Sequence, residues 1–164
     1  MSVFFSGNEI VDIAVKIEEN GREFYLAAAD AAQDSNLAAV LTKLADDEVE
    51  HKAAFQAFYS QGEDYALEPG YNEEVDAYIK ALAGSEIFAP GKSVADLARG
   101  AKDIFEVLNL AMGAEKDSIL YYTEMKDWVQ PKDKSVIGEI ILEEKKHLKE
   151  LSDLHKKLRD GCCS

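Results

Sequence analysis

Two stretches of the chain carry a glutamate followed three residues later by a histidine. They are Glu48-x-x-His51 and Glu144-x-x-His147. On an α-helix, residues three apart lie on the same face, so each pair presents a carboxylate beside an imidazole. Hard carboxylate oxygens combined with imidazole nitrogens suit iron or manganese. The chemistry that these residue types and this spacing predict is therefore metal binding.

Both pairs interrupt helical stripes that are otherwise apolar. The flanking stripe positions are Leu37, Leu41, Leu44, Phe55 and Phe58 around the first pair, and Ile137, Ile140, Leu151, Leu154 and Leu158 around the second. Two further stripes are each broken by a single glutamate, Glu18 in one and Glu115 in the other. Burying an unpaired carboxylate costs several kcal/mol, and none of the four stripes carries a lysine or arginine. We therefore expect metal cations to neutralise these four carboxylates.

The arrangement occurs twice along the chain. Glu48 follows Glu18 by 30 residues and Glu144 follows Glu115 by 29. A tyrosine stands seven residues after each single glutamate, at Tyr25 and Tyr122, and a small residue three after it, at Gly21 and Ser118. The repeat predicts two similar halves around one pseudo-twofold site. The two tyrosines are interpreted either as ordinary core aromatics or as residues that support the ligands from behind or transfer a radical.

The elements that must position these residues are all helical. Four stretches show helical periodicity and none shows the period-two alternation of a strand, which predicts an all-α fold. The predicted helices cover about residues 8–30, 34–60, 93–128 with a break near 99–100, and 131–159, with Pro131 in the first turn of the last and a short helix near 72–83. Short joints make each pair an antiparallel hairpin, and a long crossover at about 61–92 joins the two hairpins.

Charge and cysteine content exclude several classes of protein. The chain has 32 acidic and 18 basic side chains, a formal charge of -14, which disfavours binding to nucleic acid or to an anionic membrane. No apolar run approaches the ~20 residues that span a bilayer, and the first residues lack the features of a signal peptide, so we expect a cytoplasmic protein. The only cysteines, Cys162 and Cys163, are adjacent and are expected to form a frayed tail rather than a redox pair.

The residues quoted above resemble the rubrerythrin family of the ferritin-like di-iron carboxylate superfamily. Its signature is a glutamate followed seven residues later by tyrosine and then by Glu-x-x-His, repeated in the second half. The likeness covers about residues 8–159. It implies a ferritin-like four-helix bundle with two non-haem iron ions, manganese or zinc being alternatives, that react with hydrogen peroxide or dioxygen. The implied metal ligands are Glu18, Glu48, His51, Glu115, Glu144 and His147.

The chain also departs from that family pattern. It contains no paired Cys-x-x-Cys motifs of a rubredoxin domain, so electrons are expected from a separate donor such as a rubredoxin-like protein. Ser118 stands where rubrerythrins carry an extra glutamate, which makes the ligand set similar to the more symmetric site of bacterioferritin. No methionine lies in the first two helices to bind haem, so no haem is expected.

These observations combine into one hypothesis with two alternatives. Residues 1–161 form the di-iron bundle and residues 162–164 a short tail. Glu48 and Glu144 bridge the two ions, with Glu18 and His51 on one side and Glu115 and His147 on the other. The protein is a di-iron oxidoreductase that reduces hydrogen peroxide or dioxygen; the alternatives are a ferroxidase, for which iron is the substrate, and a non-enzymatic metal-binding bundle.

Several residues around this site are given a different interpretation. We expect a homodimer, because the apolar residues Phe4, Phe5 and Phe88 are predicted to be exposed. Surface positions are expected for Glu19, Asp47, Glu143 and His155. One of the three acidic residues would then serve at most to guide Fe(II) inward.

Overall fold

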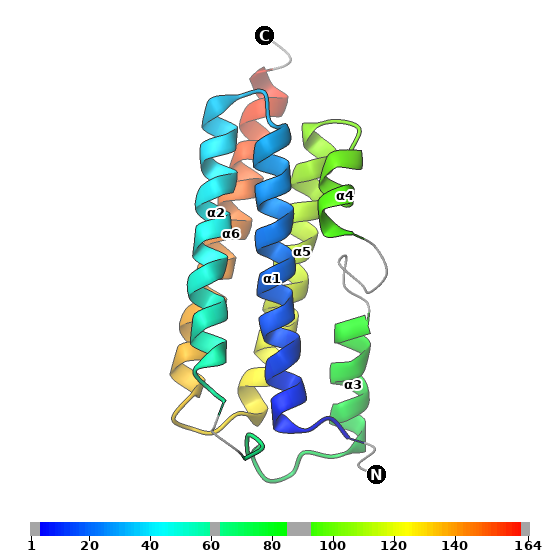
Figure 1. Cartoon of the computed structure of the whole chain (residues 1–164), viewed down its shortest axis with the longest axis vertical. Helices are drawn as coiled ribbons and strands as arrows, with labels where there is room; N and C mark the ends of the chain where they lie inside the picture. Colours follow the sequence, from blue (N-terminus) through cyan, green and yellow to red (C-terminus); the bar gives the residue numbers. More distant parts are fainter. Residues whose placement is uncertain (1–3, 60–62, 85–92, 162–164) are drawn as a thin grey trace.

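The computed structural model describes residues 4–59, 63–84 and 93–161. These residues form six helices and contain no β-strand: α1 (Gly7–Ala31), α2 (Ser35–Gln56), α3 (Glu73–Gly84), α4 (Val94–Gly100), α5 (Ile104–Trp128) and α6 (Lys134–Gly161). The four long helices run side by side along the molecule, while α3 and α4 follow one another along one flank (Figure 1). The predicted all-α bundle is confirmed. None of these helices combines the length and the apolar character needed to cross a membrane.

Two helical hairpins make up the bundle. Helix α1 packs along α2, and α5 packs along α6, with short connections between the members of each pair. The crossover between the hairpins contains α3, which packs on α5, and α4, which packs on α1 (Figure 1). The predicted order of hairpin, long crossover and hairpin is therefore present.

Acidic and hydroxyl side chains start the helices. Ser6 and Glu9 form a capping box on α1: the Glu9 N–H donates to Ser6 Oγ at 3.2 Å, and the Ser6 N–H donates to Glu9 Oε2 at 2.7 Å. Asp34 caps α2 by accepting from the Leu37 N–H at 2.8 Å. Ser93 caps α4 as predicted, and Asp103 begins α5 after the break that the sequence predicts near residues 99–100.

Two predicted helix boundaries differ from the structure. Helix α2 ends at Gln56, about one turn before the predicted end at 60, because the buried Phe58 turns inward to pack on Phe55 and Tyr65. Helix α6 begins at Lys134, so Pro131 lies in the preceding turn and not in the first turn of the helix. At the end of α2, tertiary packing decides the boundary.

The buried apolar side chains form two separate clusters. One contains Ile10, Phe55 and Ile137, and the other contains Leu41, Leu108 and Leu151. Along α1 the first cluster ends at Ile17 and the second begins at Phe24. The six predicted metal ligands are among the buried polar residues of the four long helices between these clusters. The hydrophobic core is therefore divided by a polar layer.

Polar contacts hold the crossover to the start of the chain and to the connection between α5 and α6. Asp76 on α3 accepts a hydrogen bond from the Phe5 N–H at 2.7 Å and pairs with Lys80 at 2.5 Å. The Tyr65 hydroxyl donates to Asp133 Oδ2 at 2.5 Å and accepts from the Gln130 N–H at 2.9 Å. Phe5 is partly buried and packs on the core, whereas Phe4 is exposed; Phe88 lies outside the described residues.

The start of α1 allows a direct test of this attachment. A Cβ at Gly7 would lie 1.8 Å from the backbone carbonyl oxygen of Tyr65, so Gly7→Ala must push the crossover away. We expect Gly7→Ala to lower the free energy of unfolding by about 1–3 kcal/mol, measured by denaturant titration. Gly84→Ala is the matched control, because nothing lies within 4 Å of its added Cβ. Equal stability of the two variants would contradict this packing.

Candidate metal centre

The structure places all six predicted ligands in the polar layer. Glu18 comes from α1, Glu48 and His51 from α2, Glu115 from α5, and Glu144 and His147 from α6. None of the six is more than 5% exposed. Each long helix therefore contributes to the layer, and α2 and α6 contribute the two Glu-x-x-His pairs.

The six side chains divide into two overlapping groups, each with its ligand atoms within 4.8 Å of one another. The groups are Glu18, Glu48, His51 and Glu144, and Glu48, Glu115, Glu144 and His147. Glu48 and Glu144 belong to both groups. Carboxylates can bind two ions at once, so the arrangement has the donors for a pair of metal ions that share two glutamates. This is the division between shared and separate residues that the sequence predicts.

Both imidazoles turn the same ring nitrogen toward the carboxylates. His51 Nδ1 lies 2.9 Å from Glu144 Oε1 and 3.6 Å from Glu18 Oε2. His147 Nδ1 lies 3.2 Å from Glu144 Oε2 and 3.7 Å from Glu115 Oε1. The Nδ1 atoms are therefore the nitrogens that face the shared glutamates.

Three buried ligand atoms of the layer form no hydrogen bond, although two of them, His51 Nδ1 and Glu144 Oε1, lie 2.9 Å apart as an ion pair. The three atoms are Glu18 Oε2, His51 Nδ1 and Glu144 Oε1, all from the first group. A buried polar atom without a partner costs about 1–3 kcal/mol, so such atoms are rare unless they serve a purpose. These two carboxylate oxygens and one imidazole nitrogen belong to one compact group and form no hydrogen bond. Such a set of ligand atoms fits a metal cation.

Burial and mutual repulsion shift the protonation of the layer. Burial, together with the charges of neighbouring glutamates, raises the pKa of Glu48 and of Glu115 well above the usual 4.5. Burial alone would lower the pKa of His51, but its close contacts with the carboxylates of Glu144, Glu18 and Glu48 outweigh this and raise it. Without metal, protons thus supply part of the positive charge that the carboxylates need.

Each tyrosine of the repeat contacts a glutamate of the other half. The Tyr25 hydroxyl donates to Glu115 Oε1, and the Tyr122 hydroxyl donates to Glu18 Oε1. Burial and the adjacent carboxylate raise the pKa of both tyrosines well above 10, so both hydroxyls remain protonated and donate. Since Tyr122 uses Oε1 of Glu18, it leaves the other oxygen, Oε2, for the metal position.

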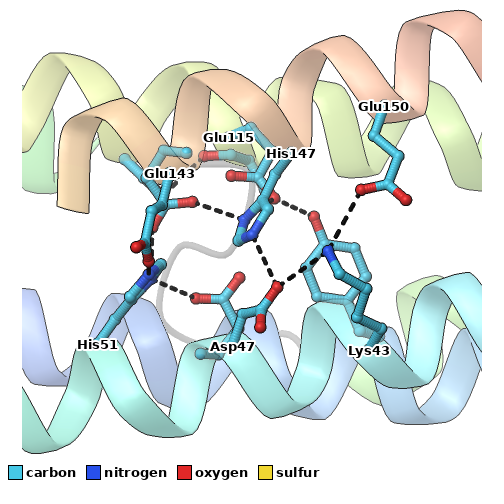
Figure 2. A network of polar contacts seen from close by, with 12 residues as sticks. Lys43, Asp47, His51, Glu115, Glu143, His147 and Glu150 are labelled. Atoms are coloured by element: carbon cyan, nitrogen blue, oxygen red, sulfur yellow. Dashed lines mark hydrogen bonds and ion pairs between the residues drawn. The ribbon is translucent and has the colours of Figure 1, made fainter. Parts of the chain in front are cut away.

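Asp47 and Glu143 have a role that the sequence does not reveal. They are expected at the surface, and their side chains are 32% and 50% exposed, but their carboxylates reach the outer nitrogens of the two histidines. His51 Nε2 donates to Glu143 Oε2 at 2.7 Å, and His147 Nε2 donates to Asp47 Oδ2 at 3.1 Å (Figure 2). Such acids fix the orientation of a ligand imidazole. The available signal was an acidic residue directly before each Glu-x-x-His.

Other residues near the layer are more ordinary. Glu19 pairs with Lys52 at 2.8 Å and with Lys16 at 3.4 Å on the surface, as predicted. The prediction that His155 is exposed is wrong, because it is half-buried against the Phe105 ring at 5.1 Å. Cys162 and Cys163 lie outside the described residues.

The small residues of the repeat leave room for the carboxylates. A Cβ at Gly21 would lie 3.3 Å from Glu48 Cδ. The Ser118 hydroxyl donates to the Ala114 carbonyl at 3.0 Å, within its own helix, and does not join either group.

Comparison with known proteins agrees with this geometry. The rubrerythrin family model matches residues 9–90, which is half of the chain. The chain belongs to the rubrerythrin family. The chain is also similar to the solved structure of a protein from Thermotoga maritima that is described as a ferritin-like di-iron-carboxylate protein. The identity is 28% and the TM-score is 0.68, with coverage of 95% of this chain and 98% of that one. No curated protein matches the chain.

A second solved structure supports the fold alone. This protein, from Pyrococcus furiosus, is 23% identical, with a TM-score of 0.68 and coverage of 95% of this chain and 92% of that one. The family match includes Glu18, Glu48 and His51 but ends before Glu115, Glu144 and His147. The assignment of the second half of this rubrerythrin site rests on the geometry described above.

The role of Asp47 and Glu143, the two acids behind the histidines, can be tested by measuring metal affinity. We expect Asp47→Ala and Glu143→Ala each to weaken metal binding about 10- to 100-fold, because the histidine loses the group that orients it. Asp46→Ala is the control, since this exposed acid is the neighbour of Asp47 and carries the same charge. The measurement is calorimetric titration of metal-free protein with Co(II). Variants that bind as tightly as Asp46→Ala would contradict the role.

Raised pKa values in the layer predict a pH effect of definite sign. Carboxyl groups with a raised folded-state pKa stabilise the metal-free protein below about pH 4.5, and this stability is lost as pH rises through the raised pKa. Metal binding strengthens over the same range because fewer protons compete. We therefore expect the difference in melting temperature between Co(II)-loaded and metal-free protein to grow from pH 5 to pH 8, measured by scanning calorimetry. A difference that stays constant from pH 5 to pH 8 would show that the carboxyls are already ionised at pH 5, and would contradict the prediction.

Proposed function

We propose that this rubrerythrin is a non-haem di-iron oxidoreductase that reduces hydrogen peroxide, with dioxygen as a second oxidant. The observation that carries the proposal is the pair of buried ligand groups sharing Glu48 and Glu144, three of whose buried ligand atoms form no hydrogen bond. The chemistry of the ligands also supports iron, because carboxylate oxygens with imidazole nitrogens suit iron and manganese better than they suit soft metals.

Each residue of the layer has a defined task in this proposal. Glu18 and His51 would hold one ion, Glu115 and His147 the other, and Glu48 and Glu144 both. Two ferrous ions, when bound, supply the two electrons that convert one peroxide molecule to water. Zinc could occupy the same donors but supplies no electrons, and that case corresponds to the non-enzymatic bundle.

The surrounding side chains hold and shield the ligands. Tyr25 and Tyr122 each donate to one oxygen of Glu115 and of Glu18, and at Glu18 the other oxygen, Oε2, is the one that faces His51. The two apolar clusters close the layer on both sides along the bundle and exclude bulk water. A groove of about 560 Å³ reaches Glu18 and Glu48 from the α1, α2 and α4 surface, which allows a small oxidant to approach.

Electron delivery belongs to the same proposal. The chain supplies no rubredoxin-type cysteine pairs, so we assign reduction of the iron pair to a separate donor such as a rubredoxin-like protein. We also propose that the protein works as a homodimer, for which the exposed Phe4 is one candidate contact.

A ferroxidase is the second candidate function. It is favoured by Ser118, which takes the place of an additional glutamate and turns its hydroxyl to its own helix. With six ligands and no seventh carboxylate, the site has less to hold ferric iron after oxidation. In that case Fe(II) is the substrate and leaves as Fe(III).

One experiment separates these functions. Metal-free protein is titrated anaerobically with Fe(II), and the loaded protein is then mixed rapidly with hydrogen peroxide or dioxygen. We expect two Fe(II) per chain, faster oxidation by peroxide, and iron that stays bound and can be reduced again. Faster reaction with dioxygen and release of ferric iron would instead establish the ferroxidase.

Two variants test the shared glutamates in the same assay. Glu48→Ala and Glu144→Ala should abolish paired binding, because each removes a ligand from both groups. Glu50→Ala, an exposed glutamate on α2, is the control and should bind two ions. Unchanged two-iron binding in both ligand variants would refute the di-iron assignment.

A further inference from the structure

The two acids behind the histidines are not held equally. On α2, Lys43 Nζ lies 3.2 Å from Asp47 Oδ2, the same oxygen that accepts from His147 Nε2. Lys43 also contacts Glu150 Oε2 on α6 at 3.4 Å (Figure 2). The lysine therefore connects the two hairpins and fixes the carboxylate that orients His147.

Glu143, the counterpart of Asp47, has no such support. Its side chain is 50% exposed, and among the described residues it forms no ion pair with a lysine or arginine. A glutamate also has one more rotatable bond than an aspartate, so more freedom must be lost to hold it in place. His51 is thus oriented by a looser group than His147.

The sequence repeat shows that the two halves carry different residues at the positions of Lys43 and Glu150. Lys43 stands five residues before Glu48, and the matching position, five before Glu144, is Glu139. Glu150 stands six after Glu144, and the matching position, six after Glu48, is Ala54. The Glu143–His51 side of the site therefore has neither the cation nor the carboxylate that would balance it.

The groove on the protein surface also reaches the two halves of the polar layer unequally. The groove of about 560 Å³ is lined by Glu18 and Glu48, whereas Glu115 and both histidines are not among its lining residues. The groove therefore reaches the ligand groups from the Glu18 side.

We propose that Lys43 makes the two metal positions unequal, so that the Glu115/His147 position retains its ion and the Glu18/His51 position exchanges a divalent cation through the groove. This inference rests on the proposed function, because it requires two bound ions. Lys43 acts as a positioning residue: by holding Asp47 it pre-orients His147, and less freedom is lost when the ion binds. Glu150 offsets the lysine charge, so the support adds little repulsion toward the ion.

The test uses Co(II) as the probe and the full-length, metal-free protein. Co(II) binding is followed by visible absorption and calorimetry, neither of which depends on turnover. We expect two steps that differ at least tenfold in affinity. Glu18→Gln should weaken only the second step, which assigns that step to the groove side.

Variants of Lys43 then test its role. Lys43→Met should weaken the tighter step about three- to fivefold, the range expected when a partly exposed ion pair is lost. Lys43→Arg should restore it. Lys157→Met is the control, because it removes the same charge from an exposed position on α6 and should leave both steps unchanged.

The converse variant provides an independent check. Glu139→Lys places a cation four residues before Glu143, where the two side chains can pair on one helix face. We expect it to tighten the weaker step about two- to fivefold and to slow the faster phase of Co(II) removal by a chelator. A wild-type protein with two equal steps, or a Lys43→Met variant that behaves like Lys157→Met, would overturn the inference while leaving the paired site in place. Uptake of fewer than two Co(II) per chain would instead overturn the proposed function itself.

Discussion

The structure depends on the burial of four carboxylates and two imidazoles in the middle of a helical bundle. Every long helix carries at least one of these groups, and together they divide the apolar core into two clusters. Such a layer disfavours folding unless positive charge enters it. In the metal-free protein, protons bound to His51, Glu48 and Glu115 reduce the net negative charge, as their raised pKa values indicate. The buried ligand atoms without hydrogen bonds are the groups that a metal cation would satisfy.

The contacts around the layer cross from one hairpin to the other. Tyr25 of the first hairpin contacts Glu115 of the second, and Tyr122 of the second contacts Glu18 of the first. The pairs Asp47 with His147 and Glu143 with His51 cross in the same way. Each half of the sequence therefore positions the ligands of the other half. This exchange explains how two separate hairpins form one site.

Much of this could be predicted from residue types and spacing. The six ligand candidates were visible because charged residues interrupted apolar stripes, a pattern that depends on helical periodicity alone. The break before α5 and the short helix in the crossover were also predictable, since Ser93, Gly100 and the polar residues of the crossover act through local backbone preferences. The end of α2 was not, because Phe58 turns inward only when Tyr65 is there to receive it.

By itself, the sequence determined the all-α fold, the doubled Glu-x-x-His arrangement and the identity of the buried charged residues, because these follow from a period of about 3.6 residues and the cost of burying charge. Only the tertiary structure decided which acid lies behind which histidine. Asp47 and Glu143 are exposed enough to look like surface residues, and their partners are about 100 positions away in the chain (100 and 92). Contacts between hairpins depend on how the helices are packed side by side, and no local pattern in one helix encodes its neighbour.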